Sequence, residues 1–155
     1  MKPYQALIQH WSVEGLTISP GISEEALQDF ESKQRVSFPA DFREYLANVN
    51  GMAPIGGQDS DGKGFAFWPL NRIRSVPEEC AAGRIRVPTF EGVESYFAFA
   101  DYMQWSWAYA ISLQLSQSGK ILQFGTHSPT VIAGSFTEFV EAYLRDSKQL
   151  YVPQI

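Results

Sequence analysis

One cysteine and two histidines are the side chains of this sequence best suited to nucleophilic catalysis. A cysteine hydrolase needs a thiolate and a positioned base that activates it. Cys80 stands between Glu79 and Ala81, without a recognised nucleophile signature, and neither His10 nor His127 is close to it in the sequence. A neighbouring carboxylate raises the pKa of a thiol, which makes the thiolate scarcer. We therefore predict no catalysis at Cys80, although contact with a histidine in the folded chain stays open.

The segment Asp59-Ser60-Asp61-Gly62 has the oxygen-rich composition of part of a calcium loop. If Gly62 is aligned with the invariant glycine of such a loop, Gly57 takes the first ligand position and Trp68 the last, and neither suits calcium. A single cysteine leaves no thiolate cluster for zinc. The glycines within 56–64 are not followed by Lys-Ser or Lys-Thr, so they form no phosphate-binding loop. We predict no metal and no cofactor, and a segment that is either a plain connection or a partner-contacting loop.

Two arginine pairs alternate along the sequence, Arg72 with Arg74 and Arg84 with Arg86. If both pairs lie on strands, each pair shares a face and forms a patch for a small anion or an acidic partner. The alternative is a solvated sheet edge, because exposed edge strands are commonly protected by charge.

Length and composition bound the class of protein. A chain of 155 residues fits one domain, residues 1–155. With 12 basic and 17 acidic residues, the net charge of −5 argues against nucleic-acid binding, which needs a surplus of Lys and Arg. The start, Met1-Lys2-Pro3-Tyr4, lacks the apolar run of a signal peptide, and the longest apolar stretch, Trp105–Leu113, is too short to span a bilayer. We expect a cytoplasmic protein without membrane contact.

Helical periodicity predicts helices over residues 3–12, 24–35, 39–49 and 136–146. Ser23 and Ser135 are suitable N-caps, the latter with Glu138 as a capping box, and Pro39 suits a first helical turn. Asn50-Gly51 is predicted to end the third helix, with Gly51 in the left-handed conformation. The apolar stripes comprise Leu7, Ile8 and Trp11; Leu27 and Phe30; Phe42, Tyr45, Leu46 and Val49; and Phe136, Phe139, Val140, Tyr143 and Leu144.

Between the third and the last helix the apolar pattern alternates and predicts strands at 65–68, 85–90, 96–100, 105–113 and 120–124. In the clearest strand, Trp105, Trp107 and Tyr109 point to one face and small residues to the other, which lets a helix approach closely. The aromatic residues are expected in the core, with a partly open aromatic surface as the alternative. The order of elements predicts an α+β fold, with the helices on an antiparallel sheet. Six residues are expected to be buried: Phe42, Leu46, Trp107, Ile111, Phe139 and Val140.

The chain carries a run that resembles the hallmark of the SUKH superfamily, the Smi/Knr-type immunity-protein family: Phe38-Pro39-Ala40-Asp41-Phe42-Arg43-Glu44-Tyr45-Leu46, then Asn50-Gly51. Later pieces are similar to its strands and final helix: Phe67-Trp68-Pro69-Leu70, Asp101 followed by Tyr109-Ala110-Ile111, and Ala133-Gly134-Ser135-Phe136-Thr137-Glu138-Phe139. The likeness covers about residues 22–145. It implies N-terminal helices and a C-terminal helix packed on a curved antiparallel sheet.

The resemblance also implies a function. Bacterial members are mostly immunity proteins that neutralise a cognate polymorphic or contact-dependent toxin by direct binding, without catalysis. The implied partner is a cognate protein toxin, with a basic nuclease-type effector as one candidate. An adaptor or regulatory domain of the same fold is the first alternative, and a small-ligand-binding protein is the second.

Six acidic residues are predicted to contribute to docking such a basic toxin: Asp59, Asp61, Glu78, Glu79, Glu91 and Glu94. All lie in segments expected to be exposed loops or turns, where binding residues are frequent. Reversal of Asp59 and Asp61 to lysine is expected to slow association and to leave folding nearly unchanged. The region from Arg72 to Arg86 is the alternative surface.

Overall fold

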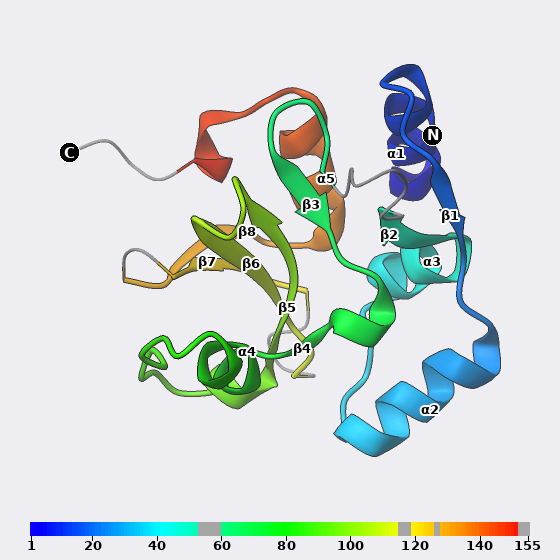
Figure 1. The fold of residues 1–155 in the computed structure, drawn as a ribbon. Helices are drawn as coiled ribbons and strands as arrows, with labels where there is room; N and C mark the ends of the chain where they lie inside the picture. The colour runs from blue at the N-terminus through cyan, green and yellow to red at the C-terminus, as the bar shows by residue number, and fades with distance from the viewer. Residues whose placement is uncertain (53–59, 115–118, 126–127, 152–155) are drawn as a thin grey trace.

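Figure 1 shows the fold as a computed structural model, which describes residues 1–52, 60–114, 119–125 and 128–151. The helices are α1 (Pro3–Val13), α2 (Glu24–Gln34), α3 (Ala40–Asn48), α4 (Val76–Ala82) and α5 (Phe136–Leu144). The strands are β1 (Ile18–Pro20), β2 (Val49–Met52), β3 (Phe65–Phe67), β4 (Arg74–Ser75), β5 (Tyr96–Tyr102), β6 (Trp107–Ser112), β7 (Ile121–Phe124) and β8 (Thr130–Ala133). Short 3₁₀ turns occupy Leu70–Arg72, Val93–Ser95 and Lys148–Leu150. The predicted α+β class is confirmed.

Helices α2 and α5 begin where their serine caps predict, whereas Pro39, predicted as a first helical residue, is the N-cap of α3. The hydroxyl of Ser23 accepts a hydrogen bond from the Ala26 backbone N–H, and that of Ser135 accepts one from Glu138. A capping side chain satisfies one of the backbone N–H groups that the first turn leaves unpaired. The Glu138 carboxylate reaches back to the N–H of Gly134, one residue before the expected cap position. Serine caps therefore fix the starts of α2 and α5.

Gly51 takes the predicted left-handed conformation, with φ at 66°, but it belongs to β2 and not to a helix cap. α3 ends at Asn48, and the chain turns directly into β2. A Cβ added at Gly51 would lie 2.6 Å from the carbonyl carbon and oxygen of Trp68. The glycine thus lets β2 pass against the segment that follows β3.

The main sheet is antiparallel, with strand order β3-β5-β6-β7-β8, and β4 also pairs with β5. β1 and β2 form a separate two-stranded sheet. Side chains opposite one another on paired strands share a face of the sheet. The face that carries the aromatic core is the first face, and the opposite one is the second face. Two cross-strand rows lie on the second face: Ala66–Asp101–Ala108–Phe124 and Ala98–Ala110–Leu122–Val131.

The first face of the sheet carries an aromatic core beneath α3 and α5. The Phe42 ring lies 5.6 Å from that of Phe99 and 5.1 Å from that of Phe136, and Phe139 contacts both Phe99 and Tyr109. α1 joins this layer because the Trp11 indole N–H donates to the Tyr143 hydroxyl on α5. Five of the six residues predicted to be buried are buried: Phe42, Leu46, Ile111, Phe139 and Val140. Trp107 is only half-buried, since it begins β6 at the end of the sheet, where it stacks on Tyr102.

The second face is covered by α4 and the loop that follows it, which lie away from α1 in Figure 1. Ala98, Ala108 and Ala110 are completely buried on this face, and α4 contacts β4 and β5 there. The predicted strand at 85–90 is wrong, because that segment is the loop after α4. Its apolar residues Ile85, Val87 and Phe90 are partly buried against the core, and the segment pairs with no strand. The sequence patterns also did not predict α4, β1, β2, β4 and β8.

Candidate protein-binding surface

Trp105 joins two buried carboxylates, that of Asp101 on the second face of the sheet and that of Glu79 on α4. The Trp68 indole N–H donates to Oδ2 of Asp101 over 2.7 Å, and the Trp105 backbone N–H donates to Oδ1 of the same residue over 3.2 Å. The Trp105 indole N–H then donates to Oε1 of Glu79 over 3.0 Å, and Nε of Arg74 donates to Oε2 of Glu79. A buried carboxylate is tolerated when it is paired and hydrogen-bonded, as both are here. The chain of contacts holds the side chains at this surface in fixed positions.

A left-handed turn directs Trp105 to the second face. Met103, Gln104 and Trp105 have φ values of 48°, 55° and 65°. This conformation costs roughly 1–2 kcal/mol for each residue other than glycine. The Trp105 ring lies 5.6 Å from that of Phe124, on the second face, whereas Trp107 stacks on Tyr102. The prediction that Trp105 continues the strand and shares the face of Trp107 is therefore wrong, because the turn reverses the chain before β6 begins.

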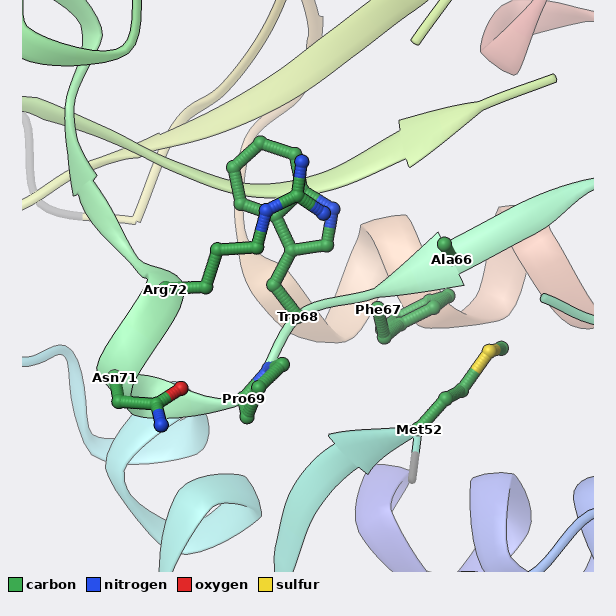
Figure 2. A pocket seen from close by; sticks show the side chains of 7 residues that line it. All are labelled: Met52, Ala66, Phe67, Trp68, Pro69, Asn71 and Arg72. Atoms are coloured by element: carbon green, nitrogen blue, oxygen red, sulfur yellow. The ribbon is translucent and has the colours of Figure 1, made fainter. Parts of the chain in front are cut away.

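Arg72 covers the Trp68 ring, as Figure 2 shows, with its guanidinium carbon 3.7 Å from the ring centroid. Its Nη1 lies 3.6 Å from Oδ2 of Asp101, the oxygen that accepts from the Trp68 indole. This cation–π contact lies beside a pocket of about 210 Å³ lined by Met52, Ala66, Phe67, Trp68, Pro69, Asn71 and Arg72. The pocket is mostly apolar, and the guanidinium of Arg72 lies over the Trp68 ring that lines it.

A second pocket of about 320 Å³ lies beside Trp105 and is lined by Arg74, Glu79, Ala82, Gly83, Ile85 and Trp105. The exposed Arg84 and Arg86 alternate with Gly83 and Ile85 of its wall. We call Arg72, Arg74, Arg84, Arg86 and Trp105 the arginine surface. The condition for two shared faces, that both arginine pairs lie on strands, is not met. Arg72 is in a 3₁₀ turn, Arg74 is in β4, and Arg84 and Arg86 are in the turn and loop after α4.

The six predicted acidic residues fall in different surroundings. Glu78, Glu91 and Glu94 are exposed, and α4 and the 3₁₀ turn Val93–Ser95, which carry Glu78 and Glu94, are in contact. Glu91 borders a third pocket that includes Phe90 and Tyr96. Asp59 lies outside the described residues. These positions leave the three glutamates as candidate contact residues.

Asp61 and Glu79 are only 7% and 5% exposed, so the expectation that they are exposed is wrong. Asp61 accepts hydrogen bonds from the backbone N–H groups of Lys63 and Phe65 and from the Tyr143 hydroxyl. Both carboxylates are thus engaged inside the fold. Sequence spacing missed this because the partner of Asp61 lies 82 residues further along the chain.

From the sequence, Asp101 and Trp68 stand out only as members of the family motifs, and no role at a binding surface is predicted for them. A local signal for Asp101 does exist. It is the one charged residue in the otherwise apolar and aromatic strand Tyr96–Tyr102, and a buried charge requires partners. The indole N–H of Trp68 is such a partner, 33 residues away.

The candidate reactive groups show no activated nucleophile among the described residues. Cys80 is buried, and burial, with a further contribution from the Glu79 carboxylate, raises the pKa of its thiol. His10 lies 3.7 Å from the Glu14 carboxylate and packs against the Tyr143 ring. His127 lies outside the described residues. Across the described ranges, no three His, Cys, Asp or Glu residues gather as a metal site would require, and no helix has the length and apolarity to cross a membrane.

Comparison with known proteins places most of this fold within one family. The family model of the SMI1 / KNR4 family (SUKH-1) matches residues 21–142. No curated protein matches the chain. The hallmark residues Phe42 and Leu46 are core residues, and Gly51 serves a close backbone approach. The match therefore describes the scaffold, whereas function depends on the surface that the scaffold carries.

Proposed function

The chain belongs to the SMI1/KNR4 (SUKH-1) family, and on that premise we propose that it is a non-catalytic binding domain, an immunity protein that neutralises a cognate toxin by direct binding. Family membership is the observation that carries the proposal, because the family is known for immunity proteins against polymorphic toxins. We propose that the domain meets the toxin inside the cell and therefore place it in the cytoplasm.

Two features of the structure support a binding role. The hallmark residues are used for packing, which leaves the surface free to differ between members that bind different toxins. The arginine surface combines a half-buried tryptophan with arginines, the residue types that most often dominate protein–protein binding energy. The hydrogen bonds of Asp101 and Glu79 to Trp68, Trp105 and Arg74 organise this surface before binding, which lowers the cost of association.

The test is to identify a toxin domain encoded beside the gene of this protein and to co-express it with the chain. We expect the chain to restore growth of cells that produce the toxin and to co-purify with it as a stable complex. Growth arrest in the presence of folded chain would contradict the proposal.

A toxin variant inactivated in its own active site separates binding from catalysis. An immunity protein that works by capping binds this inactive toxin as tightly as the active one. Restored growth without a complex would instead indicate that the chain acts on the toxin or on its product as an enzyme.

A further inference from the structure

We propose that the arginine surface docks an acidic segment of the partner protein, with carboxylates on the guanidinium groups and an apolar side chain in the pocket beside Trp105. This inference rests on the proposed function for the identity of the partner, but the surface itself is tested separately below. It replaces the acidic docking surface expected from the sequence as the principal contact.

The charge of the region runs against that of the whole chain. The protein has a net charge of −5, yet Arg72, Arg74, Arg84 and Arg86, four of its 12 basic residues, lie within one short stretch. Opposite charge steers two proteins together and selects among partners. A local excess of arginine in an acidic protein therefore favours an acidic segment on the other side.

The arginines expose their charge, while the carboxylates beneath them do not. The side chains of Arg72 and Arg74 are 43% and 41% exposed, but those of their partners Asp101 and Glu79 are 8% and 5% exposed. A partner therefore meets guanidinium groups first, with the anions screened below. Each buried carboxylate fixes an arginine in place, which reduces the side-chain entropy lost on binding.

Arg84 and Arg86 add charge without internal compensation. Both are exposed, and neither forms an ion pair within the described part of the chain. Glu78 is the exposed carboxylate on neighbouring α4, and it accepts a hydrogen bond from the Ser75 hydroxyl. Exposed cations thus outnumber exposed anions between residues 72 and 86. Arginine is suited to this role because its planar donors match a carboxylate in a bidentate arrangement.

The pocket beside Trp105 supplies the apolar part of the site. Its wall combines Ala82, Ile85 and the Trp105 ring with the Arg74 guanidinium, around a volume of about 320 Å³. A leucine or phenylalanine flanked by acidic residues would place its side chain against Ile85 and Trp105 and its neighbours' carboxylates near the arginines. Apolar anchors in desolvated pockets supply most of the affinity, and surrounding charges supply specificity.

The first experiment uses a synthetic peptide of alternating glutamate and leucine as the probe, titrated into the full chain and followed by amide and indole NMR shifts. We expect shifts at Ala82–Ile85, at the Arg74 backbone and at the Trp105 indole N–H. An absence of shifts, or shifts confined to other elements, would overturn the proposal. Tighter binding of a single-stranded oligothymidylate at the same residues would overturn it as well, in favour of a nucleic-acid surface.

A charge-reversed pair of variants supplies the control. Arg84→Glu with Arg86→Glu is expected to weaken peptide binding by about tenfold or more, because both charges are exposed and belong to the proposed contact surface. Lys33→Glu with Lys148→Glu changes the net charge by the same amount on exposed residues of other elements and is expected to weaken binding less than about threefold. Equal losses in both variants would show only a general charge effect and would overturn the proposed site. Unchanged thermal unfolding confirms that each variant is folded.

The toxin experiment keeps the two proposals apart. If the wild-type chain restores growth and the Arg84→Glu/Arg86→Glu variant restores it equally well, immunity stands and the arginine surface is wrong. If the peptide binds at Trp105 but the wild-type chain neither restores growth nor binds the toxin, the surface stands and immunity is wrong.

Discussion

The carboxylate of Asp61 accepts a hydrogen bond from the phenolic hydroxyl of Tyr143 and thereby fastens the turn before β3 to helix α5. Tyr143 accepts in turn from the Trp11 indole, so the same contact reaches α1. Asp61, which was predicted from the sequence to dock a partner, thus links three segments that are distant in the sequence.

This link predicts that Asp61 governs stability. Asp61→Ala removes the acceptor of three hydrogen bonds in a buried position and is expected to lower the free energy of unfolding by about 2–3 kcal/mol. Urea denaturation measures the change. Glu94→Ala, at an exposed acidic position, is the control and should stay within about 0.5 kcal/mol of wild type. An Asp61→Ala variant as stable as the Glu94→Ala control would contradict the buried role.

Alanine substitutions at Gly15 and Gly51 allow the cost of a left-handed backbone to be separated from the cost of steric overlap, because the two glycines have similar φ values. Gly15 has a φ of 79° with no atom within 4 Å of an added Cβ, whereas Gly51 has a φ of 66° with Trp68 backbone atoms 2.6 Å away. Gly15→Ala should cost about 1 kcal/mol through the left-handed conformation alone. Gly51→Ala should cost about 1–3 kcal/mol more, because the overlapping atoms are backbone and must shift. Equal losses for the two variants, measured by thermal and urea unfolding, would show that β2 does not need the close approach.

Buried tyrosines predict a loss of stability in alkali. Burial raises the pKa values of Tyr45, Tyr109 and Tyr143 above the ordinary value, and the Asp61 carboxylate raises that of Tyr143 further. In the unfolded chain these phenols ionise at about pH 10. The contribution of these tyrosines to the free energy of unfolding is therefore fully present below about pH 10. It is lost as the pH rises above that value, since only the unfolded state releases the protons.

Tyr45→Phe tests this directly, because it keeps the buried ring and removes one ionisable hydroxyl. The slope of unfolding free energy against pH between about pH 10 and pH 12 should become shallower by up to about 1.4 kcal/mol per pH unit. A slope identical to that of wild type, measured by urea denaturation, would mean that Tyr45 ionises as readily in the folded protein as in the unfolded chain.

Cys80 is expected to be inert in the folded protein. Its thiol is buried, and its raised pKa keeps it protonated at neutral pH, whereas alkylation requires an accessible thiolate. Reaction with iodoacetamide should be at least about a hundredfold slower for the native chain than for the urea-unfolded chain, because it needs local opening. Cys80→Ser provides the unreactive baseline. Comparable rates for native and unfolded chain would contradict the burial of the thiol.

Local sequence signals predicted the long helices and the central strands. Caps at Ser23 and Ser135 and apolar stripes such as that of Phe42 and Leu46 are determined by residues close together in the chain, so they can be read from it. Helix α4 was missed because it has only seven residues, too few for a periodic stripe. The loop after α4 was mistaken for a strand because Ile85 and Val87, which pack against the core, are spaced two residues apart as strand residues are.

The candidate surface was predictable only in part. The arginines between 72 and 86 stand out in the sequence, but their placement depends on long-range partners. Trp105 reaches Glu79 across 26 residues, and Trp68 reaches Asp101 across 33. The left-handed conformation of Trp105 has no glycine to signal it. Spacing therefore identifies the residue types of this surface, and only the fold shows which charges are exposed.

The contact of Trp11 with Tyr143, separated by 132 residues, has a consequence for how the chain acquires its fold. Helices α1 and α3 leave the ribosome first, but the rings that cover Phe42 belong to Phe99 and Phe136, which are synthesised much later. Contacts of such high sequence separation slow folding, because their loop-closure entropy must be overcome before they contribute. Part of the apolar stripes of the N-terminal helices therefore stays uncovered until α5 emerges, and a nascent chain that stalls before residue 136 exposes that apolar surface to chaperones.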